Sequence, residues 1–140
     1  STAFGILGAA APAMMRTGGS IVLTASAASR IGMANHEAIA AAKGAIMGLT
    51  LSAAATYAAR GIRVNCVAPG LVETPLTESL LSSDANRKAS QGMHALGRLG
   101  SPSDVAHSMA WLLSEESSWV TGQVLGVDGG LGSILPRMRA

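Results

Sequence analysis

The hydroxyl group of Ser26 and the ammonium group of Lys43 belong to one predicted unit of strand, loop and helix. The apolar run IVL at 21–23 leads to the hydroxyl-bearing Thr24 and Ser26, passes through a loop with glycine, and enters an alanine-rich segment that carries Lys43. This order is typical of a βα unit. In open α/β sheets the carboxyl ends of the strands face the ligand crevice, so Ser26 is predicted at a site with Lys43 leaning over it. The two residues form a candidate active site.

The spacing of these residues resembles that of the short-chain dehydrogenase/reductase family. In that family a serine at the end of the fifth strand is followed thirteen residues later by a tyrosine, and four residues after that by a lysine. Ser26 and Lys43 match this spacing, whereas Ile39 occupies the tyrosine position. The single tyrosine of the chain, Tyr57, lies fourteen residues beyond the lysine and cannot take that place by spacing.

The resemblance implies a mechanism in which the residue at the position of Ile39 is the general acid/base. The family's tyrosine is the general acid/base, its lysine lowers the pKa of that tyrosine and holds the cofactor ribose, and its serine hydrogen-bonds the substrate oxygen. A positioned proton donor is worth about 10² to 10⁴ in rate. Ser26 and Lys43 are therefore expected as catalytic residues, with water, His36 or Glu37 in place of the tyrosine. The simpler interpretation of His36 and Glu37 is that they start a helix and face solvent.

A second run, RVNCVAPGLVETP at 63–75, also resembles the family. In these enzymes a Pro-Gly turn follows the sixth strand, and the chain then passes the nicotinamide end of the cofactor. The resemblance implies that Pro69 and Gly70 form the turn, that Val72 offers backbone groups to the carboxamide, and that Thr74 offers its hydroxyl to carboxamide or phosphate. With Lys43, these are the predicted binding residues for NAD or NADP. A Pro-Gly pair by itself predicts only a turn.

The rest of the chain predicts the elements that position these residues. Asn35 is a plausible N-cap, Gly61 a left-handed helix end, and Ser101 with Asp104 a capped helix start. The resemblance implies an α/β fold, the carboxyl-terminal half of a Rossmann-type doubly wound parallel sheet with strands five to seven and flanking helices. The predicted elements are a helix at 2–16, strands at 20–25, 62–67 and 123–127, a helix at 36–59, a mobile lid at 75–99, and a helix beginning at Pro102.

Composition restricts the possible partners. The chain has 140 residues, 49% hydrophobic and 13% charged, with a formal net charge of +2, which suits one globular domain. Scattered basic residues without interleaved aromatics argue against nucleic acid, and no uninterrupted apolar run reaches the ~18 residues of a membrane span. The lone Cys66 suits a reducing, cytoplasmic location. His36, His94 and His107 lack metal-ligand spacing, so no metal is expected.

The glycine-rich turn that binds a dinucleotide pyrophosphate is not found. Gly18 and Gly19 precede a strand, and Gly129 and Gly130 follow the last strand without a helix after them. We therefore expect residues 1–140 to be a single partial NAD(P)-binding domain that lacks the N-terminal half. An open sheet edge where the fourth strand should pair is a liability, so we expect a longer polypeptide or a pairing subunit.

Two functions follow from these observations. The first is an NAD(P)-dependent oxidoreductase of the short-chain type acting on a small-molecule alcohol or carbonyl substrate. The alternative is a catalytically silent relative kept as a nucleotide-binding or scaffold subunit, which Ile39 favours. A lyase or epimerase on the same scaffold is a third possibility, because fold does not fix function. The alanine-rich 36–59 helix and the resemblance imply a homo-oligomer, a dimer or a tetramer.

Overall fold

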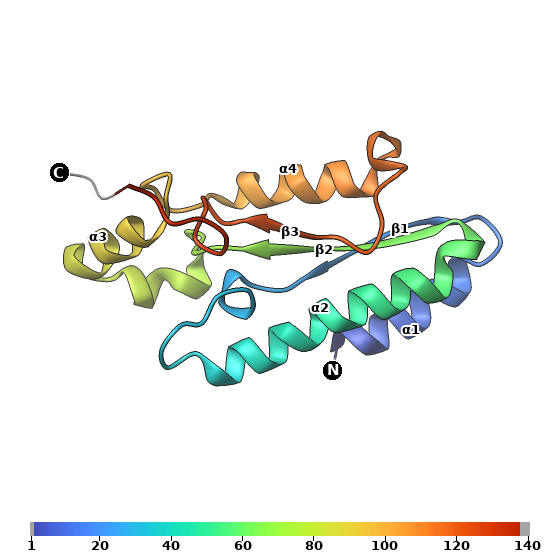
Figure 1. Ribbon diagram of the computed structural model, residues 1–140, viewed down its shortest axis with the longest axis horizontal. Coiled ribbons are helices and arrows are strands. Elements are labelled where there is room, and N and C mark those ends of the chain that lie inside the picture. The colour runs from blue at the N-terminus through green and yellow to red at the C-terminus, as the bar shows by residue number, and fades with distance from the viewer. Residues whose placement is uncertain (1, 138–140) are drawn as a thin grey trace.

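Three parallel strands lie between helices in the computed structural model, which describes residues 2–137 (Figure 1). Helices α1 and α2 lie on one side of the sheet and α4 on the other, while α3 stands beyond the strand ends. This arrangement confirms the predicted α/β fold with part of a doubly wound parallel sheet. The elements are α1 (Thr2–Met14), β1 (Gly19–Thr24), η1 (Ala27–Ser29), α2 (Glu37–Tyr57), η2 (Ala58–Arg60), β2 (Ile62–Pro69), η3 (Pro75–Leu81), α3 (Asp84–Met93), α4 (Pro102–Leu113), η4 (Glu115–Ser117) and β3 (Val124–Val127).

The central strand of the sheet is β2, which pairs with β1 on one side and β3 on the other. Its register joins Thr24 to Val67 and Pro69 to Val127, so the carboxyl ends of all three strands meet at one edge. Because β2 is covered on both faces, most of its residues are apolar. The core is built from the strands with α1 and α2, and its fully buried members include Ala11, Ile62, Val64, Cys66 and Ala68.

A buried polar network fastens the start of β2 to the far end of α4. Arg63 donates from Nη1 to Ser117 Oγ at 3.0 Å and from Nη2 to the Ser114 carbonyl at 2.9 Å. Beside it, the fully buried Asn65 donates to the Val120 carbonyl and accepts from the Gln123 N–H. These bonds satisfy backbone groups that would otherwise be costly to bury. They fix β3 and α4 relative to the central strand.

Helix α2, which carries Lys43, begins later than predicted. Asn35 is not its N-cap: it has a left-handed φ of 61°, and His36 occupies the N-cap position without a capping side-chain hydrogen bond. Asparagine adopts this conformation more readily than most residues, so its backbone tolerance turns the chain instead of its side chain capping the helix. At the other end η2 closes on Gly61, whose φ of 67° confirms the predicted left-handed cap.

The lid segment is more regular than its loose sequence pattern predicted. Residues 75–81 form the 3₁₀ helix η3, and α3 follows with Ser83 at its N-cap, where the Ser83 hydroxyl accepts from the Asn86 N–H at 3.1 Å. Helix α4 starts as predicted, with Ser101 at the N-cap and Pro102 at the first position. The lid is therefore a folded unit with two helices of its own, η3 and α3, and it lies between β2 and α4 along the chain.

The helix at Glu37–Arg60 is, by length and composition alone, long and apolar enough to cross a membrane. The helix has no uninterrupted apolar run of this length because Lys43 interrupts it, but an 18-residue window within it has a mean hydropathy of 1.5. A core helix of a folded domain passes the same test, and α2 packs against β2 through its buried Thr50, Ala53 and Ala54. Most of its remaining surface is uncovered within this chain.

Candidate active site

The hydroxyl of Ser26 is held in place directly after β1. The strand pairing continues one residue beyond β1, because the Ala25 N–H donates to the Val67 carbonyl at 2.8 Å. Ser26 then caps the turn η1, with its Oγ accepting from the Ala28 N–H at 3.2 Å and its carbonyl accepting from Ser29 Oγ at 2.6 Å. Since the hydroxyl acts as an acceptor within the turn, its hydrogen is left to donate to a ligand oxygen.

Lys43 reaches back from the second turn of α2 to the end of the same strand. Its Nζ donates to the Thr24 carbonyl at 3.2 Å. An ammonium group carries three donors, and within the described residues this is the one hydrogen bond that Lys43 makes. The structure therefore brings Ser26 and Lys43 to one strand end, as their spacing predicted, and leaves two lysine donors for other groups.

Ile39 lies one turn before Lys43 on the same face of α2, because residues four apart are neighbours on a helix. Its side chain is 44% exposed, although it is aliphatic. It can neither give nor take a proton. The space next to Ser26 and Lys43 where the family carries its acid/base thus presents a hydrocarbon surface.

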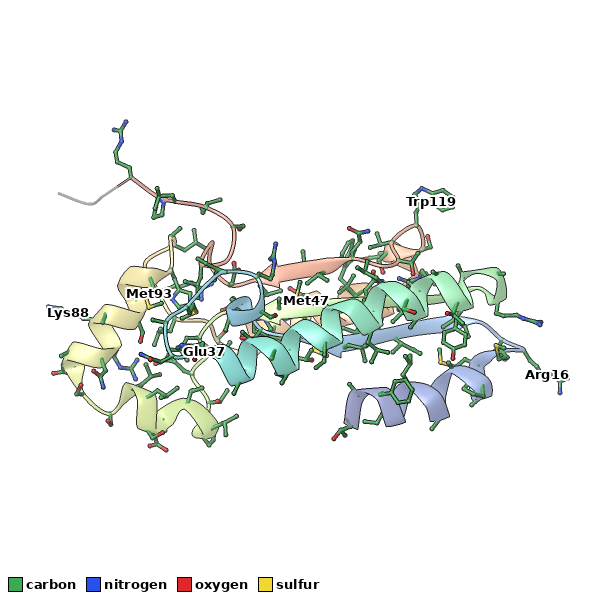
Figure 2. All side chains as sticks on the ribbon, turned by 60° about the horizontal axis from the view of Figure 1, so that its bottom comes forward. Arg16, Glu37, Met47, Lys88, Met93 and Trp119 are labelled. Carbon is green, nitrogen blue, oxygen red and sulfur yellow. The ribbon has the colours of Figure 1, made fainter. Side chains whose placement is uncertain are left out.

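The two substitute proton donors stand at the start of α2. The Nδ1 of His36 lies 2.8 Å from the Ala34 carbonyl. Because a carbonyl only accepts, Nδ1 carries the hydrogen and donates it. Glu37 lies in the first turn, near the lid in the view of Figure 2. In the part of the chain that the structure describes, neither residue hydrogen-bonds Ser26 or Lys43. Their role as proton donors stays a prediction.

The loop of residues 69–74 leaves β2 under close backbone control. The Gly70 N–H donates to the Val127 carbonyl at 3.1 Å, and Val72 forms a short parallel bridge with Gly100. In that bridge Leu71 and Glu73 supply the bonds to Gly100, so the backbone groups of Val72 face the other way. Its carbonyl accepts from Thr77 Oγ1 at 2.6 Å, and its N–H has no bond within the described residues. That N–H suits a carboxamide oxygen.

Thr74 is also placed at the loop, but its hydroxyl is already engaged. Thr77 Oγ1 gives its hydrogen to Val72, so the 3.2 Å contact between the two threonine hydroxyls is donated by Thr74. The Thr74 N–H donates to Thr77 Oγ1 at 3.0 Å in return. The hydrogen of the Thr74 hydroxyl is therefore used, whereas its oxygen can still accept from a ligand N–H. Sequence reasoning missed Thr77, although the T-x-x-T spacing before a helical turn is a capping signal.

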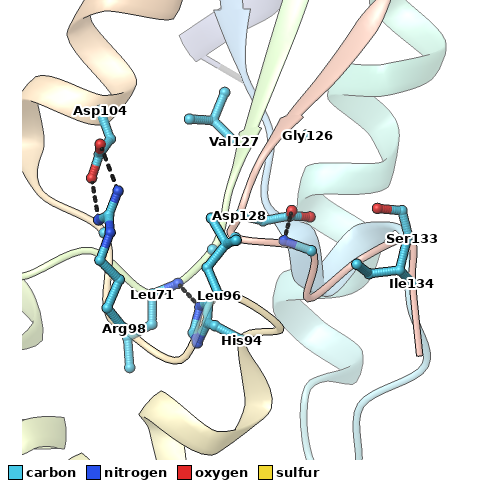
Figure 3. Close-up of a pocket in the computed structure, with 14 residues that line it drawn as sticks. Leu71, His94, Leu96, Arg98, Asp104, Gly126, Val127, Asp128, Ser133 and Ile134 are labelled. Carbon is cyan, nitrogen blue, oxygen red and sulfur yellow. Dashed lines mark hydrogen bonds and ion pairs between the residues drawn. The ribbon is translucent and has the colours of Figure 1, made fainter. Parts of the chain in front are cut away.

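A cavity of about 460 Å³ opens beside this loop, at the carboxyl ends of β2 and β3 (Figure 3). Of the predicted site residues Gly70 lines it, whereas Ser26 and Lys43 do not. His94 projects into its wall as a buried side chain, and no sequence signal pointed to it, since it has no ligand or helix-start pattern around it. The other lining residues include Leu71, Leu96, Arg98, Asp104, Asp128 and Ile134.

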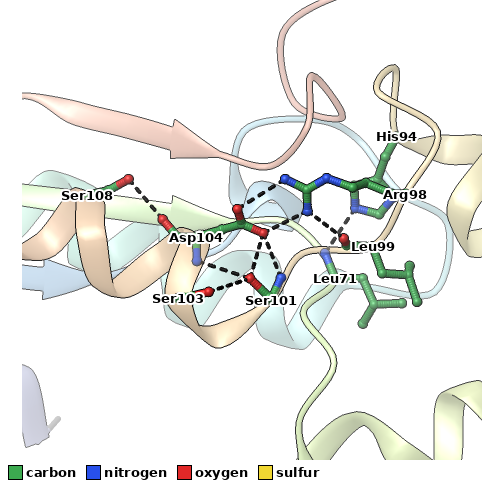
Figure 4. Close-up of polar contacts among 8 residues, drawn as sticks. All are labelled: Leu71, His94, Arg98, Leu99, Ser101, Ser103, Asp104 and Ser108. Atoms are coloured by element: carbon green, nitrogen blue, oxygen red, sulfur yellow. Dashed lines mark hydrogen bonds and ion pairs between the residues drawn. The ribbon is translucent and has the colours of Figure 1, made fainter.

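An ion pair closes one side of the cavity. Arg98 donates to both carboxylate oxygens of Asp104, at 2.7 and 3.0 Å, while the Ser101 N–H donates to the same carboxylate at 2.8 Å (Figure 4). The Arg98 hydrogen bonds, followed by that of the Ser101 backbone, hold the pKa of Asp104 well below its usual range. Asp104 is therefore a permanent anion at neutral pH, and it serves the N-terminus of α4.

Comparison with known proteins places this geometry in a family. The model of the family described as enoyl-(acyl carrier protein) reductase matches residues 1–132. A short-chain type dehydrogenase/reductase from Mycobacterium ulcerans superposes with a TM-score of 0.88 at 35% identity, covering 93% of this chain and 48% of that one. The chain belongs to the short-chain dehydrogenase/reductase family and corresponds to the carboxyl-terminal region of its Rossmann fold.

Other relatives show how much of a full protein is represented. The chain is 44% identical over 119 residues to a 2,5-dichloro-2,5-cyclohexadiene-1,4-diol dehydrogenase of Sphingobium indicum, covering 84% of this chain and 48% of that protein. A gluconate 5-dehydrogenase from Burkholderia cenocepacia, solved in complex with NADP and tartrate, superposes with a TM-score of 0.90 at 34% identity, covering 95% of this chain and 52% of that one. The chain spans about half the length of these relatives.

Proposed function

We propose that the protein to which these residues belong is an NAD(P)-dependent oxidoreductase of the short-chain type, acting on a small alcohol or carbonyl substrate. The observation that carries this proposal is the convergence of two predicted residues on one strand end: Lys43 Nζ binds the Thr24 carbonyl, and two residues later the Ser26 hydroxyl is held with its hydrogen free. Ser26 polarises the substrate oxygen and Lys43 holds the cofactor ribose. The proton comes from water, His36 or Glu37.

The nicotinamide end of the cofactor would lie along the 69–74 loop. The Val72 N–H, which makes no hydrogen bond within the described residues, fits the oxygen of a carboxamide at this place. A bound nicotinamide supplies the hydride acceptor or donor. We propose that residues 1–140 form one partial cofactor domain, and that the pyrophosphate site and the choice of NAD or NADP belong to other residues of the protein. The homo-oligomer and the cytoplasmic location remain part of the same proposal.

Titration of NADH and NADPH against the full-length protein tests the cofactor role. Lys43→Ala is expected to weaken binding roughly tenfold or more, because hydrogen bonds from charged groups are the strong ones. Lys88→Ala is the matched control, since Lys88 is exposed on α3 and lies away from the strand ends (Figure 2). It should bind like the parent. Equal affinities of the Lys43→Ala variant and the parent would remove the assigned role.

The second candidate is a catalytically silent nucleotide-binding or scaffold subunit, and the exposed, aliphatic Ile39 favours it. Ile39→Tyr discriminates between the two functions, with Ile39→Phe as a control of similar size without the hydroxyl. If the parent is silent, tyrosine creates a reductase activity of about 10² to 10⁴ above the background of the phenylalanine variant. If the parent is active and tyrosine leaves its rate unaltered, another proton donor is in use and the oxidoreductase stands.

A further inference from the structure

His94 is a buried histidine whose two ring nitrogens are both engaged. Its side chain lies at the carboxyl end of α3 and is 4% exposed. The Leu71 N–H donates to Nε2 at 3.1 Å, and Nδ1 lies 2.7 Å from the Ser90 carbonyl (Figure 3). A backbone N–H can only donate and a carbonyl can only accept. The geometry therefore requires a neutral ring with its hydrogen on Nδ1.

The hydrogen bond from Leu71 to His94 joins two segments. Leu71 lies between Gly70 and Val72 in the 69–74 loop, and His94 lies in the lid of residues 75–99. Other contacts connect the same segments: Thr77 bonds Val72 and Thr74 through its hydroxyl, and Arg87 pairs with Glu73. These contacts are made by a hydroxyl group and by two charged side chains that are 42% and 49% exposed. The imidazole is the buried side chain among them.

The imidazole packs closely against the loop and the end of β3. A Cβ placed on Gly70 would lie 2.7 Å from His94 Nε2 and 3.0 Å from Asp128 Cα, and one on Gly129 would lie 3.4 Å from His94 Cβ. A side chain at position 70 would therefore push on the ring, whereas one at 129 would only touch it. The ring is held on this side by its packing as well as by its two hydrogen bonds.

The charged groups around the same cavity are already used. The Asp128 carboxylate accepts from the Gly130 and Gly132 N–H groups, each at 2.9 Å. Arg98 and Asp104 bind one another. Among the described residues that line the cavity, these are the charged side chains. None of them forms a hydrogen bond with His94, so the Leu71 N–H is the partner of Nε2 within the described residues.

We propose that His94 is a positioning residue that couples the lid to the loop holding the nicotinamide end of the cofactor, through the acceptor at its Nε2. The Leu71 N–H donates to this ring nitrogen, so loss of the acceptor would release the loop from the end of α3. The part about the cofactor rests on the proposed function, whereas the junction itself does not.

Hydrogen–deuterium exchange of the full-length protein, without ligand, tests the junction. Protection of the Leu71 amide, corrected for the intrinsic exchange rate, is compared between the parent and its variants at one pH. A variant without an acceptor at position 94 is expected to lose about tenfold or more of this protection, because a buried donor is left without its acceptor. The exposed His107 provides the control His107→Gln, which should behave like the parent.

Two variants at position 94 separate positioning from simple packing. His94→Gln keeps an acceptor within reach of the Leu71 N–H, so protection should stay near that of the parent. His94→Leu keeps bulk without an acceptor and should show low protection. Parent-like protection in the leucine variant overturns the proposal. A tenfold loss of protection in the glutamine variant also overturns it, even if the leucine variant does not fold.

Cofactor titration tests the second half. His94→Leu should bind NADH or NADPH about tenfold more weakly than the parent, whereas His94→Gln should bind like the parent. Parent-like affinity in the leucine variant, with the exchange result intact, would overturn the coupling to the cofactor. Absence of binding in the parent and in every variant would overturn the proposed function, and the exchange experiment alone would then judge the junction.

Discussion

Cys66 shows how a single side chain can be inert beside a site. It is fully buried on β2, and its Sγ donates to the Val67 carbonyl at 3.3 Å. Burial raises the pKa of the Cys66 thiol, outweighing the hydrogen bond from Ala25 and the nearby charge of Lys43. Because the pKa is higher in the folded state, the thiol contributes stability that is complete below the unfolded pKa and is lost as the pH rises through the folded one.

The reactivity of Cys66 follows from the same burial. At about pH 8 we expect the peptide containing Cys66 to be alkylated at least about tenfold more slowly in the native protein than in denaturant, because the thiolate is the reactive form. Mass spectrometry of quenched samples measures both rates. The unfolded sample is its own control for intrinsic reactivity. Equal rates in the two states would mean that the strand opens readily around Cys66.

At this scale the sequence predicted what depends on local spacing. Ser26 and Lys43 belong to one strand, loop and helix, so their meeting at the end of β1 could be expected. His94 could not be expected, because its acceptor role depends on Leu71, 23 residues earlier, and on the lid folding back across the strand ends. Asn35 was misassigned because the same residue type suits an N-cap and a left-handed turn.

Among the elements, α4 has the clearest start. Ser101 Oγ accepts from the Asp104 N–H at 3.2 Å, and the Asp104 carboxylate accepts from the Ser101 N–H at 2.8 Å, which completes a capping box (Figure 4). Ser101→Ala should lower the free energy of unfolding by about 1 kcal/mol. Ser118→Ala, at an exposed serine whose side chain makes no hydrogen bond within the described residues, should change it by less than about 0.5 kcal/mol. Chemical denaturation of the full-length variants measures both values, and equal losses would contradict the capping role.

The elements themselves were predictable where pattern and caps agree. The strand at Ile62–Pro69 and the helix from Pro102 appear almost as the sequence indicated. The lid was less predictable because its order comes from tertiary ties: Arg87 pairs with Glu73, and Thr77 folds back on Val72. A sparse apolar pattern gives little sign of such contacts, since each partner is an ordinary surface residue in the sequence.

On the scale of the whole molecule, two surfaces lack cover within the described residues. The edge of β1 away from β2 has no neighbouring strand, so its backbone groups face outward. The outer faces of α1 and α2 also expose large apolar side chains, among them Phe4, Ile6 and Leu51, which are 66%, 58% and 58% exposed. An apolar surface of this kind marks an interaction site more often than a solvent face.

The exposed side of α2 leads to the last prediction, on assembly. If the full-length protein is a homo-oligomer that buries this face, Leu51→Glu places a charge in the interface and should lower the molar mass in solution to that of a smaller species, because an unpaired buried charge is costly. Leu80→Glu is the matched control: Leu80 is 59% exposed on η3, at the lid, and its charge should leave the mass unchanged. Light scattering after size exclusion gives the masses. A monomeric parent, or a Leu51→Glu variant with the mass of the parent, would mean that this face of α2 is not an interface between subunits.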